Sequence, residues 1–341
     1  MAGPEKGASR IWWFAFGYFA AYVPYSALTK AVTTGAVPGD GSIDGFVLLP
    51  VTVATSMVAM FTFLTVMRWW RYASRGQLFG RSVPRPGRYT FASGFCTAAI
   101  IGTTTLAYTF EGVSIVFVML LMRGGVLMIA PIVDTITGRR PRWFSWVALL
   151  LSLAALLVSF SERGGYAISI VSAVDIAVYL TSYFIRLRFM SRLAKSGDRE
   201  TTLRYFVEEQ MVASPAMFLA LVVIAIAAPG PIGDSVREGF TTFLSSPVIG
   251  HAVLIGLLSQ GTGIFGGLIL LDSRENTFSV PVNRSSSILA GVAASYALAL
   301  TLDADLPSTY ELIGAALVIT AILFLTLPPL FERESRARPV P

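Results

Sequence analysis

Ten apolar stretches, separated by short polar segments, divide the chain from end to end. Most of them reach the roughly 18 residues or more that an α-helix needs to cross about 30 Å of hydrocarbon. The short connections predict antiparallel neighbouring helices packed into one bundle. We therefore predict an all-α integral membrane protein with ten transmembrane helices, over residues 11–32, 45–67, 89–110, 113–135, 143–160, 166–187, 206–228, 248–271, 279–302 and 308–330.

Two similar phrases stand in the fourth and the ninth of these stretches. Arg123 is followed by two glycines and an aliphatic run, RGGVLMIA, and Arg284 is followed by serines and a similar run, RSSSILAG. Ten helices divide into five and five, and since five is odd, the second set enters the membrane from the opposite side. We predict two inverted five-helix repeats, residues 1–160 and 161–341, with the functional site between them.

Composition agrees with a membrane protein, and the charges predict its orientation. Hydrophobic residues make up 54% of the chain and charged residues only 13%, whereas about a quarter of a soluble domain is charged. Most of the 26 Lys and Arg residues fall on the side of the N-terminus, including six arginines between Arg68 and Arg88. Since cytoplasmic loops are rich in Lys and Arg, both termini are predicted to be cytoplasmic. The net charge of +6 then reflects topology beside an anionic leaflet rather than a nucleic-acid surface.

Several kinds of site are excluded by composition. The chain has one cysteine, Cys96, and one histidine, His251, so it offers no internal disulfide and no cluster for zinc or haem. It contains no P-loop motif and no soluble nucleotide-binding domain, so ATP hydrolysis would not drive it directly. We expect no metal and no cofactor, and we expect energy from an ion or proton gradient, from exchange, or from the substrate's own gradient.

The residues leading out of the ninth stretch carry a family resemblance. Pro281 and a polar patch precede small residues, then an acidic loop, Asp303–Asp305, and the closing ELIGAALVI at 311–319. Together with the ten-span layout and the basic loops, this pattern resembles the drug/metabolite transporter superfamily, in particular its EamA-like and nucleotide-sugar or triose-phosphate transporters. The resemblance covers essentially the whole chain and implies transport by alternating access.

Arg123, Asp175 and Arg284 lie inside predicted spans, whereas drug exporters of that group usually carry few charged residues there. Such residues are expensive in lipid and normally face a cavity, a partner or a substrate. Phosphate-handling members of the family carry basic residues in this span, which implies that Arg284 binds a phosphate or a carboxylate. The alternative is that its side chain reaches the cytoplasmic interface. Arg123 lies deeper and either faces the cavity or pairs with an acid. Asp175, the carboxylate at comparable depth, would form that ion pair structurally, or substrate and protons would compete for the pair.

Neutral polar side chains complete the predicted substrate site. Tyr25, in YVPY, and Tyr179 and Tyr183, in YLTSY, occupy similar places in the first and sixth spans. Those spans line the cavity in transporters of the family that the chain resembles, and packing is the alternative role for each tyrosine. The remaining candidates for substrate contact are Gln260, Asn283 and Ser285. A neighbouring helix could equally form hydrogen bonds with their side chains.

These observations predict a secondary transporter that moves a small, phosphate- or carboxylate-bearing organic metabolite across the cytoplasmic membrane. A proton or an exchanged solute would be the co-substrate, and the protein would be a monomer or a homodimer. Two alternatives keep the fold: an exporter of amino acids, drugs or other neutral or cationic solutes, with structural arginines, and a flippase for a lipid-linked headgroup. An enzyme acting on lipid would need grouped carboxylates or a histidine, and His251 is remote from Glu208 and Glu209. We place those two acids at the start of the seventh span, because acidic residues are favourable at the N-terminus of a helix.

Overall fold

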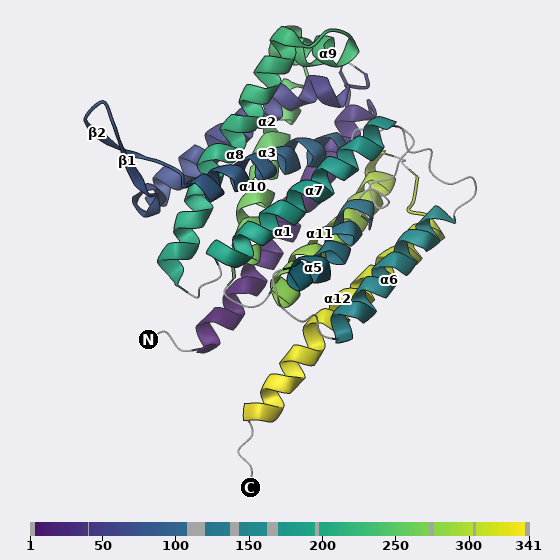
Figure 1. Ribbon diagram of the computed structural model, residues 1–341. Coiled ribbons are helices and arrows are strands. Elements are labelled where there is room, and N and C mark those ends of the chain that lie inside the picture. Colours follow the sequence, from purple (N-terminus) through teal and green to yellow (C-terminus); the bar gives the residue numbers. More distant parts are fainter. Residues whose placement is uncertain are drawn as a thin grey trace.

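The computed structural model describes residues 4–39, 41–107, 120–136, 143–161, 170–194, 198–272, 276–302 and 305–337, and nearly all of them are helical (Figure 1). The longer helices are α1 (Pro4–Thr33), α2 (Gly45–Val66), α3 (Arg88–Ala107), α5 (Gly125–Ile136), α6 (Trp143–Phe160), α7 (Ile170–Leu193), α8 (Arg199–Ala227), α10 (Ile249–Leu270), α11 (Asn276–Leu302) and α12 (Thr309–Ala337). The shorter elements are the 3-10 turns η1 (Trp69–Tyr72) and η3 (Thr242–Ser245), the π-helical turn η2 (Leu120–Gly124), helix α9 (Pro231–Phe240) and the antiparallel strands β1 (Arg75–Leu78) and β2 (Arg81–Pro84).

Six helices in the described part of the chain are long and apolar enough to cross a membrane. They are α2, α3, α7, α8, α10 and the Ser279–Leu302 part of α11. Three shorter apolar segments accompany them, Leu120–Val133, Trp146–Ala155 and Thr309–Phe324. The protein is therefore mostly helical and suited to a membrane, as predicted. The number of spans, the inverted repeats and the cytoplasmic termini stay predictions.

The predicted bounds of the second and eighth spans, 45–67 and 248–271, agree closely with α2 and α10. Two helices run beyond the sixth and seventh predicted spans: α7 continues to Leu193, and α8 begins at Arg199. Asp198 caps α8, and its carboxylate accepts hydrogen bonds from the backbone N–H groups of Glu200 and Thr201. Hydropathy detects only the apolar part of a helix, whereas polar turns extend it until a capping residue stops it. The beginning of the fourth predicted span, 113–119, lies outside the described residues.

Helices from the two halves of the sequence pack against one another. α1 lies against α10 and α11, α3 against α7 and α8, and α6 against α12. Figure 1 shows α6 and α12 side by side at one edge of the bundle. Small residues permit this packing: a Cβ at Gly94 in α3 would lie 2.5 Å from the Cβ of Val212 in α8. The interior is therefore shared between the halves.

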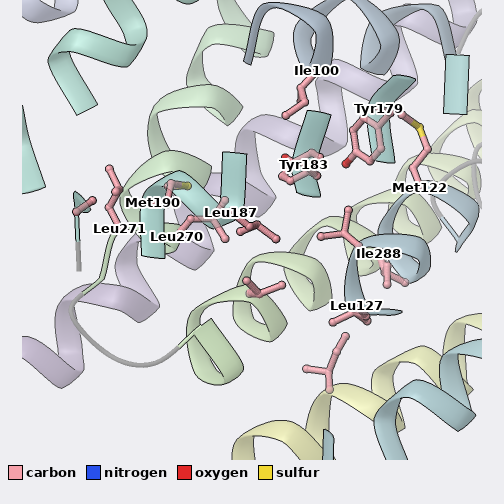
Figure 2. Packing of buried hydrophobic residues seen from close by; sticks show 14 of the residues in the cluster. Ile100, Met122, Leu127, Tyr179, Tyr183, Leu187, Met190, Leu270, Leu271 and Ile288 are labelled. Atoms are coloured by element: carbon pink, nitrogen blue, oxygen red, sulfur yellow. The ribbon is translucent and has the colours of Figure 1, made fainter. Parts of the chain in front are cut away.

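The interior is partly polar, and the surface carries many large apolar side chains. Leu150, Val223 and Leu300 are among the exposed apolar residues, whereas Arg123, Glu209 and Arg284 are buried. Figure 2 shows part of the main buried cluster, in which tyrosines of α7 lie near apolar residues from several other elements. Such an arrangement suits a lipid solvent, because it directs apolar side chains outward and encloses polar ones.

Candidate functional site

A cavity of about 80 Å³ lies between helices of both halves. Residues of α1, α2, α3, η2, α7, α8, α10 and α11 line it. A buried water molecule needs about 10–15 Å³ on this measure, so the space admits several waters or a small polar group. The polar side chains in its lining include those of Tyr18, Tyr22, Tyr25, Arg123, Tyr183, Arg186, Gln210, Gln260 and Asn283.

Helix α7 presents a polar stripe to the interior. Asp175, Tyr179, Tyr183 and Arg186 are all buried, and their spacing of three or four residues places them on one face of the helix. The ring centroids of Tyr179 and Tyr183 are 4.7 Å apart, and Figure 2 shows the two rings close together on the same helix. The stripe thus brings two phenols, one acid and one guanidinium to the centre of the bundle.

Arg123 reaches this stripe from the π-helical turn η2. Its side chain is 2% exposed and donates hydrogen bonds to the hydroxyl groups of Tyr179 and Tyr22. Its guanidinium carbon lies 5.3 Å from the ring centroid of Tyr22 and 5.5 Å from that of Tyr179. π-helical turns often occur at functional sites, because the extra residue redirects the side chains around it. Here the turn carries a charged side chain to the cavity wall.

Arg284 approaches the same phenol from α11. The side chain is 0% exposed, its Nη1 donates to the Tyr179 hydroxyl at 3.4 Å, and its guanidinium carbon lies 4.5 Å from the centroid of the Tyr183 ring. Its Nε and Nη2 atoms have no hydrogen-bond partner among the described residues. The predicted alternative, in which this side chain reaches the cytoplasmic interface, does not describe the structure. Arg284 does not line the cavity itself, but its guanidinium contacts Tyr183, and Tyr183 does line the cavity.

The two arginines therefore share one phenol oxygen, and Arg284 has no acidic partner within ion-pair distance in the described part of the chain. The neighbouring Asn283 lines the cavity, donates weakly to the Gly266 carbonyl at 3.4 Å, and has a buried side-chain oxygen without a partner among the described residues. A buried cation without a counter-charge is strongly unfavourable. The arrangement favours an anion between these groups.

The expected ion pair between Arg123 and Asp175 is not formed. Asp175 is buried in α7, and it has no ion-pair partner among the described residues. One of its carboxylate oxygens, Oδ2, has no hydrogen-bond partner there either. The pairing was inferred from similar depth, but depth does not fix the direction in which two side chains point around their helices. Tyr179, one turn further along α7, occupies the position beside Arg123 instead.

A second charged pair, which the sequence analysis missed, borders the cavity. Arg186 of α7 binds Glu209 of α8 through two hydrogen bonds of 2.9 and 2.7 Å, and the Ser93 hydroxyl donates to Glu209 at 2.6 Å. Arg186 and Glu209 are 5% and 0% exposed. Arg186, which lies next to the end of the sixth predicted span at 187, lines the cavity. A search for an acid facing each arginine across neighbouring helices could have found this pair.

The helix-start interpretation of Glu208 and Glu209 is wrong. Because α8 begins at Arg199, both acids lie well inside the helix. The Glu208 carboxylate accepts hydrogen bonds from the Ser74 and Gly87 backbone N–H groups, at 3.1 and 2.9 Å, and from the Thr90 hydroxyl at 2.7 Å. The two adjacent acids thus have different partners: Glu209 binds an arginine that lines the cavity, and Glu208 binds the base of the β-hairpin.

The structure brings most of the predicted substrate-binding residues together. Tyr25, Arg123, Tyr183, Gln260 and Asn283 line the cavity, and Tyr25 exchanges a 3.0 Å hydrogen bond with the Thr105 hydroxyl. Tyr179 and Arg284 contact lining residues without lining the cavity themselves, and the side chain of Ser285 lies outside the described residues. Lining residues that were not among the predicted contacts include Tyr18, Arg186 and Gln210.

Comparison with known proteins adds little to this geometry. No family model matches the sequence, and no curated protein matches it. A solved structure described only as "Crystal structure of protein" is 16% identical and covers 92% of this chain and 98% of its own, with a TM-score of 0.49. A likeness of that size carries no argument about function.

Proposed function

We propose that the protein is a secondary transporter that moves a small organic anion, bearing a phosphate or a carboxylate, across the membrane by alternating access. The observation that carries this proposal is Arg284, which is fully buried beside Arg123 and has no acidic partner among the described residues. A guanidinium in this state binds an oxyanion favourably, because the anion supplies the missing counter-charge and hydrogen-bond acceptors.

The Tyr179 hydroxyl marks the place where one oxygen of the anion would bind. It accepts hydrogen bonds from both guanidinium groups, as an anion's oxygen would. The rest of the substrate would extend into the cavity, where Tyr25, Gln260 and Asn283 offer hydroxyl and amide groups. Arg284 lies against the Tyr183 ring, so we expect this ring to turn aside when both arginines bind the substrate.

Thermal unfolding of the purified protein tests the proposal, since a ligand that binds only the folded state raises the melting temperature. The probes are glycerol phosphate, succinate, alanine and tetraphenylphosphonium, added in a buffer whose only small anion is gluconate. We expect one or both of the first two to stabilise the wild type, and Arg284→Gln and Arg123→Gln to lose this response. Arg237→Gln is the matched control, because Arg237 lies exposed on α9 and pairs there with Asp234 at 2.6 Å.

Counterflow of the stabilising anion into proteoliposomes then separates transport from binding. Stabilisation by alanine or by tetraphenylphosphonium alone would instead support the exporter with structural arginines. A stabilising anion that is never carried across the bilayer would contradict transport while leaving the binding site intact.

A further inference from the structure

The β-hairpin carries an aromatic residue that neither its turn nor the core explains. Strands β1 and β2 pair from Arg75 opposite Pro84 to Leu78 opposite Arg81, leaving Phe79 and Gly80 as a two-residue turn. Both turn residues have positive φ, 49° and 75°, as a type I′ turn requires. Asn or Gly suits the first position, whereas a bulky residue there is strained. Phe79 is also 98% exposed, so no packing within the chain offsets that strain. An exposed, strained aromatic side chain points to a contact outside the chain.

The base of the hairpin is fixed to the helices. The buried Glu208 carboxylate accepts the Ser74 and Gly87 backbone N–H groups on either side of it, and the Arg85 N–H donates to the Ser74 carbonyl at 2.7 Å. Figure 1 shows the hairpin projecting from the bundle at the end where α2 finishes and α3 begins. The tip is therefore held out at one end of the bundle by a defined base.

The hairpin and its flanks form a wholly basic surface. No acidic residue occurs between positions 45 and 110. Arg75, Arg81 and Arg85 are exposed, and none of them has an acidic partner in the described part of the chain. Further exposed arginines flank the hairpin at Arg68, Arg71 and Arg88. Such a surface complements a surface of phosphate groups.

Exposed apolar side chains at the base of this hairpin favour contact with lipid there. Val66, the last residue of α2, is 74% exposed, and the adjacent Met67 is 46% exposed. The indoles of Trp69 and Trp70 follow in η1, half-buried against the bundle, and indole rings favour the level of the headgroups. A hairpin that begins at that level would hold its arginines within reach of the headgroups of the same leaflet.

We infer that the hairpin of residues 75–84 docks on the membrane surface, with Phe79 inserted among the headgroups and the arginines binding the phosphates of anionic phospholipids. This inference is independent of the proposed transport. The single cysteine allows a clean test, because Cys96→Ser leaves a background in which Phe79→Cys carries one environment-sensitive nitrobenzoxadiazole label. The labelled protein is placed in nanodiscs of phosphatidylcholine, with and without phosphatidylglycerol, and quenched with doxyl-labelled lipid.

We expect blue-shifted emission and severalfold stronger quenching when phosphatidylglycerol is present. Replacing Arg75, Arg81 and Arg85 together by Gln should remove the difference between the two lipid mixtures. Glu238→Cys, exposed on α9 at the other end of the bundle, is the labelling control and should respond to neither mixture.

Three results would overturn the inference. Water-like emission in both mixtures would show that the tip faces solvent, and equal quenching in both would show that the arginines do not select anionic lipid. A blue shift that depends on protein concentration and persists without doxyl quenching would assign the tip to a second copy of the chain. If the labelled variants fail to fold, the unlabelled protein serves: phosphatidylglycerol should raise its melting temperature more than phosphatidylcholine does, and the triple arginine variant should lose that excess.

Discussion

Arg186 and Arg284 are both buried near the central cavity, yet they are compensated in different ways. Arg186 is held by the Glu209 carboxylate through two hydrogen bonds of normal length, and Ser93 adds a third bond to that carboxylate. Arg284 lies against the Tyr183 ring and has one long hydrogen bond, to Tyr179, with two of its nitrogen atoms unsatisfied among the described residues. Arg186 thus has its counter-ion within the chain, whereas Arg284 meets two tyrosine side chains and no acid among the described residues.

Under the proposed function, Arg186 is a structural charge and Arg284 is a charge that a ligand compensates. Removing one member of a buried ion pair leaves the other uncompensated and destabilises a protein by about 3–5 kcal/mol. A buried cation without an acid is already in that unfavourable state, so its removal should not destabilise the empty protein. Substitutions at the two sites should therefore have opposite effects on folding and on anion binding.

The largest effect is expected from Glu209→Gln. The substitution leaves the Arg186 guanidinium buried without its carboxylate, so we expect the free energy of unfolding to fall by about 3–5 kcal/mol. Thermal or denaturant unfolding in detergent measures this. Glu200→Gln is the matched control, because the Glu200 carboxylate lies exposed on the same helix and forms only a long ion pair with Arg204, at 3.8 Å.

The double variant Arg186→Gln with Glu209→Gln sharpens this first prediction. It removes both charges together, so it should recover a large part of the stability that Glu209→Gln loses. If the double variant were as unstable as the single one, the pair would matter through packing rather than through charge, and the comparison with Arg284 would fail.

The second prediction concerns Arg284→Gln in the empty protein. We expect its melting temperature to equal or exceed that of the wild type, because the substitution removes an uncompensated buried charge. The stabilisation by the anion should be lost, with affinity reduced by about 2–4 kcal/mol, since a fully desolvated charge contact is removed. A fall in the stability of the empty protein comparable with that of Glu209→Gln would show that Arg284 is structural, and would favour the exporter.

The sequence could predict the helical membrane fold and the cavity residues that lie on strongly apolar spans. Hydropathy located α2 and α10 closely, and the position of Arg123 and Arg284 within such spans marked them as candidates. The sequence could not predict which side chains meet, because those contacts depend on the rotation of each helix about its axis. The π-helical turn at η2 directs Arg123 to Tyr179 rather than to Asp175. Likewise, Glu209 of α8 meets Arg186 of α7 across two helices, a contact that no local pattern in the sequence indicates.

The hairpin escaped prediction for a related reason. Strands of four residues each, with arginine at two of their ends, show no apolar alternation, and their turn lacks the usual Asn-Gly pair. Its anchor, Glu208, lies more than a hundred residues away in the sequence. Long-range hydrogen bonds of this kind leave no local pattern.

A smaller effect is expected from Tyr179→Phe, which removes the hydroxyl that both arginines share. A hydrogen bond to a charged group contributes about 1.5–3 kcal/mol, but the anion's own oxygen would replace this acceptor in the bound state. We therefore expect a smaller change in anion affinity than in Arg284→Gln. Where the hydroxyl competes with the substrate for the two guanidinium groups, its removal should increase the affinity. Titration of the stabilising anion against the melting temperature measures the change. A complete loss of binding would show that the phenol itself contacts the substrate.

The smallest effect on stability is expected from Asp175→Asn. Since Asp175 has no ion-pair partner among the described residues, the substitution breaks no charged pair, and we expect the free energy of unfolding to change by less than about 1 kcal/mol. Its effect on transport should be larger, because Asp175 lies one helical turn from Tyr179, whose hydroxyl joins the two arginines. If Asp175 carries the coupling proton, it should be needed for accumulation driven by a pH gradient and dispensable for exchange of the same anion. Proteoliposome assays of both modes distinguish these roles. If Asp175→Asn kept gradient-driven accumulation while Glu209 substitutions abolished it in folded protein, the coupling carboxylate would be the one that binds Arg186, and the paired site would share in function.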